Sequence, residues 1–188
     1  TGSSGGPHLH FEVRKTENQH ALNPMLFYNL KDNVAPKILR FGVYPMDSNS
    51  FVNHKQKKQL FETVSKGNGV FVLKGPVTVW GNIGFSVQGY DYMPEMSNVY
   101  GFCTTADINS LIDYEERLAS KRNYERMFKE QNNELEIYTK LENQGIYKTT
   151  DEELAQCEVR VTDFVGNTAS LTVYLQQKYN DSLDVRTW

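Results

Sequence analysis

The sequence predicts a mainly β protein, most of which forms an antiparallel sandwich of two sheets. Tyr and Phe number 11 and 10 in the 188 residues, and Val and Thr are frequent, which is a composition typical of β-strands. Short apolar runs recur along the chain and are separated by turn residues, as in two-sheet sandwiches. One segment is dense in helix-forming residues, so we expect one short helix.

The first predicted strand covers residues 9–14, where apolar and polar side chains alternate. Residues 15–20 are polar and predict a turn, in which His20 is expected to be solvated. Asn23-Pro24 and a linker-like segment that ends at Pro36 then mark a boundary. This boundary divides the chain into an N-terminal domain, a linker and a second domain, at residues 1–30, 31–36 and 37–188.

The second domain carries strand signals almost throughout. Alternating or continuous apolar residues predict strands at 37–44, 70–73, 77–80, 83–87 and 99–103. Gly75-Pro76 is expected to separate the second of these strands from the third. The basic cluster at residues 54–58 is expected to be an exposed loop rather than a binding patch.

The best predicted hairpin joins residues 157–163 to residues 168–174, with apolar side chains alternating on both strands. Asp163 can accept backbone hydrogen bonds across the turn, and Gly166-Asn167 can take positive φ. The Asp-x-x-Gly-Asn turn resembles the terminal hairpin of bacterial immunoglobulin-like and fibronectin-type sandwich modules. This resemblance implies that the second domain is an immunoglobulin-like β-sandwich.

The predicted helix lies within residues 112–128, and a further strand is expected at 134–138. Two groups of carboxylates, Glu115-Glu116 and Asp151-Glu-Glu153, stand in polar surroundings. We interpret both groups as solvated surface rather than as acid–base centres.

Two histidines near the start of the chain are the main candidates for chemistry. His8 and His10 are two residues apart on a predicted strand, so their side chains point to the same face. A catalytic zinc takes three protein ligands and keeps one position open for water. The other histidines are His20 and His54, and no His-x-x-x-Asp or His-Glu-x-x-His pattern occurs. The pair is therefore expected to be the last piece of a site whose earlier pieces lie upstream.

The segment around these histidines has a specific resemblance. Gly2-Ser-Ser-Gly-Gly-Pro-His-Leu-His-Phe-Glu-Val-Arg14, followed by Asn23-Pro24, resembles the final motif of the lysostaphin-type zinc endopeptidases. The resemblance implies that His10 is a zinc ligand and that His8 is the catalytic histidine that polarises water or stabilises the oxyanion. Gly5 stands where the family pattern has Thr. A bare His-x-His pair is more often solvated or hydrogen-bonded, but the flanking residues reverse that preference.

The resemblance also implies a function and a location. Residues 1–30 would be the C-terminal remnant of the peptidase domain of a cell-envelope enzyme that hydrolyses peptidoglycan peptide bonds. The enzyme would lie in the periplasm or on the surface of a bacterium, with peptidoglycan or envelope proteins as partners. The family's upstream zinc ligands, a His and an Asp, and its second catalytic His are absent here, so this chain alone is expected to be inactive and to hold no zinc.

A second resemblance concerns the sandwich. Residues 107–116, 133–138 and 163–167 are similar to the C-terminal sandwich of some envelope proteins with lysostaphin-type domains, although Leu111 stands where those relatives often have His. Many sandwich domains carry binding loops rather than catalytic groups, and fold alone does not settle function. The alternative function is therefore a non-catalytic binding or scaffolding module of the envelope.

Composition excludes other classes of function. The net charge is −3 and no run of Lys or Arg forms a basic stripe, so nucleic acid is not an expected partner. No apolar stretch approaches the length of a membrane span. Cys103 and Cys157 are too far apart for a Cys-x-x-Cys motif and are expected to be free and buried, with one disulfide as the alternative. The sequence does not indicate an oligomeric state.

Overall fold

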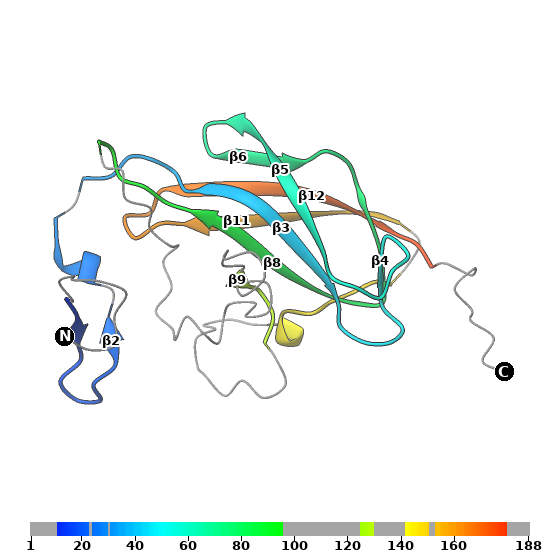
Figure 1. The fold of residues 1–188 in the computed structure, drawn as a ribbon, viewed down its shortest axis with the longest axis horizontal. Helices are drawn as coiled ribbons and strands as arrows, with labels where there is room; N and C mark the ends of the chain where they lie inside the picture. The colour runs from blue at the N-terminus through cyan, green and yellow to red at the C-terminus, as the bar shows by residue number, and fades with distance from the viewer. Residues whose placement is uncertain are drawn as a thin grey trace, which may run out of the picture.

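A computed structural model describes residues 11–22, 24–29, 31–95, 125–129, 142–150 and 153–179 (Figure 1). Its regular structure is mainly β, as predicted. The N-terminal part forms the short hairpin of β1 (Val13–Arg14) and β2 (Ala21–Leu22), followed by the 3₁₀ turn η1 (Pro24–Phe27).

The rest of the described chain forms one system of paired strands. Its elements in chain order are β3 (Lys37–Pro45), β4 (Phe51–Val52), β5 (Gln59–Gly67), β6 (Val70–Leu73), β7 (Val77–Trp80), β8 (Asn82–Tyr90), β9 (Glu125–Arg126), the 3₁₀ turn η2 (Glu142–Gly145), β10 (Tyr147–Lys148), β11 (Leu154–Thr162) and β12 (Thr168–Gln177).

These strands divide into two layers that share β5. In one layer β8 pairs with β3 on one side and with β9 and β10 on the other, and β3 pairs with residues 59–62 of β5. In the other layer residues 63–67 of β5 pair with β6, and β12 lies between β11 on one side and β6 and β7 on the other. Strand β5 therefore begins in one sheet and ends in the other.

The sheets are mixed, whereas the sequence predicted antiparallel pairing throughout. Strand β12 runs parallel to β6, with Leu171 opposite Phe71, and then parallel to β7, with Leu175 opposite Val77. The break at Gly75-Pro76 occurs as predicted, and it divides one edge of β12 between two short strands. Parallel partners need a long crossover, which the chain between residues 80 and 168 supplies.

One hydrophobic core lies between the two layers. Buried side chains alternate along β11 and β12, whereas residues 41–44 of β3 and 83–88 of β8 are buried consecutively. The rings of Phe41 and Phe85 stack with centroids 5.3 Å apart. Phe41 and Leu171, from opposite layers, are both fully buried. Full burial of such side chains contributes about 2 kcal/mol each, so this core is the main source of the sandwich's stability.

The predicted strands at 37–44, 70–73, 77–80 and 83–87 are confirmed, and so is the hairpin of β11 and β12. The basic cluster at 54–58 is an exposed turn over residues 54–57, as expected. Strand β5 was not predicted from the sequence, although Asn68-Gly69 after it is a strong hairpin signal.

The helix prediction for residues 112–128 is wrong in its described part. Glu125 and Arg126 form strand β9 against β8, and the chain bends at Met127 and Phe128. Phe128 is buried against Tyr44, with ring centroids 5.3 Å apart, so tertiary packing overrides local helix propensity here. Residues 112–124 and the predicted strands at 99–103 and 134–138 lie outside the described residues.

Candidate functional site

The predicted catalytic residue His8 and the predicted zinc ligand His10 lie outside the described residues. The chain just after them forms the β1–β2 hairpin, in which Val13 pairs with Leu22. Its connecting turn, predicted at 15–20, is closed by hydrogen bonds from Lys15 N to His20 O at 3.0 Å and from Gln19 N to Lys15 O at 2.9 Å. His20 is exposed in this turn, as expected.

The remaining histidine and the described cysteine do not form a zinc site. His54 is exposed in the turn that precedes β5, and Cys157 is a half-buried free thiol on β11. Burial raises the pKa of the Cys157 thiol, which keeps it protonated and weakly nucleophilic. Among the described residues, no His or Cys takes part in a group of three or more side chains able to hold a metal.

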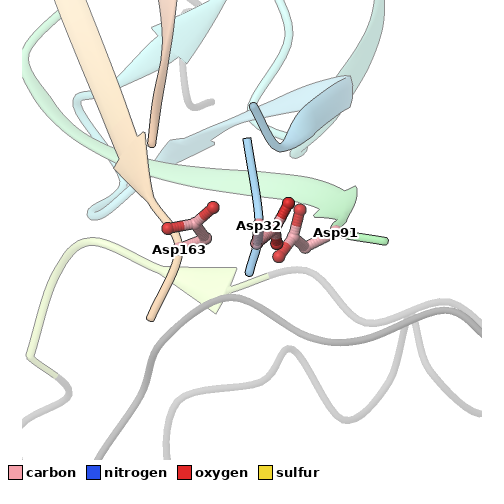
Figure 2. A group of neighbouring side chains, drawn as sticks. All are labelled: Asp32, Asp91 and Asp163. Carbon is pink, nitrogen blue, oxygen red and sulfur yellow. The ribbon is translucent and has the colours of Figure 1, made fainter. Parts of the chain in front are cut away.

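A group of three aspartates does assemble, and we call Asp32, Asp91 and Asp163 the aspartate cluster. One carboxylate oxygen of each residue lies within 4.8 Å of the corresponding oxygens of the other two. Figure 2 shows the three side chains together. Asp32 comes from the segment before β3, Asp91 follows the end of β8, and Asp163 follows the end of β11.

The Asp163 side chain is fixed by its own turn. Its Oδ1 atom accepts hydrogen bonds from three backbone N–H groups, those of Val165 at 2.9 Å, Gly166 at 2.7 Å and Asn167 at 2.9 Å. Its Oδ2 atom accepts one from Asn167 Nδ2 at 2.6 Å. Gly166 has φ of 101°, a conformation that favours glycine. The predicted role of Asp163 in the turn is therefore confirmed, and Oδ2 keeps acceptor capacity toward the cluster.

Asp32 belongs to the predicted linker, and that segment lies against the sandwich. Asp32 Oδ1 accepts a hydrogen bond from Val34 N at 2.9 Å, whereas Oδ2 is buried without a hydrogen-bond partner. Asn167 Nδ2 also donates to the Asp32 carbonyl oxygen at 3.3 Å. Pro36, at the end of the segment, is buried. Side-chain and backbone contacts thus tie this segment to the β11–β12 turn.

Asp91 is the least satisfied member of the cluster. The residue is only 1% exposed, and its Oδ1 atom has no hydrogen-bond partner. The pKa of Asp91 is raised to about 6, mainly by burial and to a smaller extent by the charges of Asp163 and Asp32, against the lowering effect of the Tyr92 backbone N–H. A buried carboxylate beside two others is costly to ionise. It therefore either keeps its proton or requires a cation that compensates its charge.

No cation of the described chain neutralises the cluster. None of the three aspartates forms an ion pair with a described residue. Lys37, close in sequence to Asp32, places Nζ over the rings of Tyr92 at 4.9 Å and Tyr90 at 6.0 Å. A surface depression beside Asp32, lined by Lys31, Asn33, Pro94, Glu95 and Val165, leaves this end of the sandwich open to solvent. The cluster can therefore share a proton or accept a cation.

Trp80, Tyr90 and Tyr92 each contact another aromatic ring of the fold. Trp80 is half-buried and meets Tyr179 edge-on at 5.3 Å. Tyr90 and Tyr92 are also half-buried, and their rings lie 6.3 Å apart. All three rings therefore pack within the fold.

The aspartate cluster was not predicted from the sequence, because its members are far apart in the chain. Each aspartate lies at a predicted boundary: Asp32 in the linker, Asp91 after the strand at 83–87, and Asp163 in the hairpin turn. Positions beside strand ends were the available signal. Which strand ends meet depends on sheet topology, which short-range patterns do not specify.

Comparisons with known proteins give no family. No protein-family model matches the chain, no curated protein is significantly similar to it, and no solved structure matches it. Among the described residues no helix is long and apolar enough to cross a bilayer. Any function must therefore be argued from the chain's own residues.

Proposed function

We propose that this chain is the C-terminal portion of a cell-envelope zinc endopeptidase that hydrolyses peptide bonds of peptidoglycan. The observation that carries the proposal is the Gly-Gly-Pro-His-Leu-His-Phe-Glu-Val-Arg sequence that ends at Arg14. His10 is the proposed zinc ligand, and His8 is the proposed catalytic group that acts on the attacking water or the oxyanion. The sandwich is an accessory module attached to the peptidase domain.

The described residues do not complete the proposed zinc site. Catalytic zinc sites use three protein ligands, and the described histidines, His20 and His54, are each exposed in a separate turn. The aspartate cluster offers oxygen ligands alone, whereas zinc in proteins favours histidine and cysteine. Bound zinc would polarise the scissile carbonyl and activate water. In this proposal the other ligands come from additional chain, and no activity is expected from this chain alone.

The hairpin after the motif supports this assignment. Phe11, Phe27 and Tyr28 are each more than half exposed, at 56%, 59% and 54%. The rings of Phe11 and Tyr28 lie 6.1 Å apart and touch no other described ring. A two-stranded hairpin is only marginally stable alone. In the proposed enzyme, the remainder of the peptidase domain would cover these aromatic side chains.

The test compares this chain with the longer protein that the proposal requires. The purified 188-residue chain is expected to contain less than one zinc per ten molecules and to leave peptidoglycan intact. The longer protein is expected to bind one zinc and to release cross-link peptides. His10→Ala should abolish both properties, and His8→Ala should abolish hydrolysis while zinc is retained.

The matched control is His54→Ala, which removes an exposed imidazole of the sandwich and should change neither zinc content nor hydrolysis. If the longer protein binds zinc but His10→Ala leaves its zinc content and hydrolysis unchanged, the peptidase assignment of this motif is wrong.

A non-catalytic envelope module is the second candidate. It is favoured by the continuous apolar core of the sandwich, which forms a stable scaffold for binding loops. Sedimentation of the longer protein with peptidoglycan, together with its zinc content and hydrolysis, separates the candidates. Saturable binding by a longer protein that contains no zinc and cuts nothing would support the module.

A further inference from the structure

We propose that the aspartate cluster is a calcium site, which fastens the segment before β3 to both layers of the sandwich. The site is separate from His8 and His10 and does not depend on peptidase activity. It consists of Asp32, Asp91 and Asp163, with one carboxylate oxygen of each directed toward the ion.

The buried, unpartnered oxygen of Asp91 is the observation that distinguishes this site from an ordinary acidic patch. Asp91 is 99% buried, and its Oδ1 atom lacks any hydrogen-bond donor. Leaving such an acceptor unsatisfied costs about 1–3 kcal/mol, and more when the group is charged. Asp32 Oδ2 is a second buried acceptor without a partner in the same group. A bound cation would satisfy both oxygens at once.

The remaining oxygens are already held in place. Asp163 Oδ1 is saturated by three backbone N–H groups, and Asp32 Oδ1 accepts from Val34 N. Asp32 Oδ2, which has no hydrogen-bond partner, is therefore fully available to a ligand, and one oxygen of Asp163 keeps acceptor capacity. For Asp163 that oxygen is Oδ2, which the Asn167 amide holds at 2.6 Å. The acceptors are oriented before any ion arrives, which lowers the entropic cost of binding.

The chemistry of the cluster selects calcium among common cations. Its ligand atoms are carboxylate oxygens, which suit hard cations such as Ca²⁺ and Mg²⁺. Calcium binds oxygen at about 2.3–2.6 Å in flexible geometry, so two of its ligands can lie up to about 4.8 Å apart. The three aspartate oxygens fall within that separation. Magnesium demands a nearly regular octahedron near 2.1 Å, whereas calcium accepts flexible geometry, so three carboxylates held by separate segments suit calcium better.

The position of the cluster gives the ion a structural role. Asp32 belongs to the connecting segment, Asp91 to the layer that contains β8, and Asp163 to the layer that contains β11. An ion bound to all three would join these parts at one point. It would also remove the repulsion among three carboxylates that no described cation compensates.

Thermal unfolding of the 188-residue chain at pH 7.5 tests the proposal. Melting is followed in 1 mM EDTA, in 5 mM CaCl₂ and in 5 mM MgCl₂. We expect calcium to raise the Tm by about 5 °C relative to EDTA, and magnesium to raise it by less than half as much. The calcium shift should vanish in Asp91→Asn, which preserves side-chain shape but removes the charge. The Tm of this variant in EDTA shows that it is folded.

Asp47→Asn is the matched control, because Asp47 lies at the other end of the sandwich with both carboxylate oxygens hydrogen-bonded. It should retain the full calcium shift. The proposal is overturned if calcium leaves the wild-type Tm unchanged, or if Asp91→Asn keeps the shift. The first result would mean that the cluster shares a proton instead of binding an ion. Because the measurement needs neither zinc nor peptidoglycan, its outcome is independent of the peptidase proposal.

Discussion

The two ends of the sandwich treat aspartate carboxylates in opposite ways. At one end Asp47 Oδ1 accepts hydrogen bonds from Ser50 Oγ at 2.7 Å and Asn49 N at 2.9 Å, and Oδ2 accepts one from Asn82 Nδ2 at 2.7 Å. The Ser50 hydroxyl is the largest cause of a lowered Asp47 pKa, which the Asn82 and Asn49 hydrogen bonds lower further against partial burial. At the other end Asp91 keeps an unpartnered oxygen and a raised pKa.

The same two strands lead to both ends. Strands β3 and β8 pair from Lys37 and Tyr90, near the aspartate cluster, to Pro45 and Ile83, near Asp47. Nine strand residues span about 27–30 Å, so the two groups do not interact directly. The network around Asp47 is complete without a ligand, whereas the cluster requires a proton or a cation. One end of a folded domain can thus be stable through its own hydrogen bonds, while the stability of the other end depends on pH and on cations in solution.

The largest effect is expected from Gly81→Ala, at the end of the sandwich where the hydrogen bonds of Asp47 are complete. Gly81 has φ of 85°, and an added Cβ would meet Ser50 Oγ and lie 2.9 Å from the Asn49 carbonyl oxygen. Strain and displacement of the buried Ser50 should lower the unfolding free energy by about 4 kcal/mol, measured by urea denaturation. Gly67→Ala is the control: its φ is 88° but no atom lies within 4 Å of the added Cβ, so about 1 kcal/mol is expected. Equal losses in both variants would show that packing around Gly81 is unimportant.

At the opposite end, Asp163→Ala should be the most destabilising change in the cluster. It leaves three backbone N–H groups without their acceptor, at a cost of about 3 kcal/mol in urea denaturation. Asp163→Asn keeps an acceptor oxygen and should recover at least half of that loss. If alanine and asparagine prove equally harmful in EDTA, the charge of Asp163 rather than its hydrogen bonding stabilises the turn.

Glu125 allows the effect of burial to be separated from the effect of neighbouring acids. Burial alone raises its pKa from 4.5 to about 7. The folded state therefore binds more protons than the unfolded state between these values, and stability falls as the pH rises from 4.5 to 7. Glu125→Gln should be more stable than wild type by about 2 kcal/mol at pH 8 and equal to it at pH 4.

Urea denaturation of both proteins at the two pH values measures this difference, and added calcium should leave it unchanged. A calcium-dependent difference would place Glu125 in the same electrostatic unit as the cluster and would weaken the comparison between the two ends.

The smallest expected effects are changes in unfolding free energy of opposite sign at the two ends of the sandwich. In EDTA at pH 8, Asp91→Asn should raise the unfolding free energy by about 1 kcal/mol, because it removes an uncompensated buried charge. Asp47→Asn should lower it by less than about 1 kcal/mol, because it weakens hydrogen bonds to an exposed carboxylate. Urea denaturation of the two variants in parallel gives both signs. Destabilisation by Asp91→Asn in EDTA would mean that its carboxylate is already compensated.

The sequence predicted most strands of the sandwich but not the aspartate cluster. The apolar alternation on β3, β11 and β12 and the Asp163 turn were sufficient for strands and for one hairpin, because these signals are local. Strand β5 was missed because it changes sheets, so neither of its faces is continuously apolar. Parallel pairing of β12 and assembly of the cluster depend on contacts between distant segments. His8 and His10 remain a prediction of the motif alone.

Hydrogen–deuterium exchange of the 188-residue chain, with calcium and with EDTA, tests the central claim most directly. Calcium should slow amide exchange in residues 31–35, 91–93 and 163–167, where the three aspartates meet. Exchange in residues 47–50 and 81–82, around the hydrogen bonds of Asp47, should not change. Protection confined to the cluster end is the result that the calcium site predicts. Unchanged exchange in all three cluster segments, or equal protection at both ends, would contradict it.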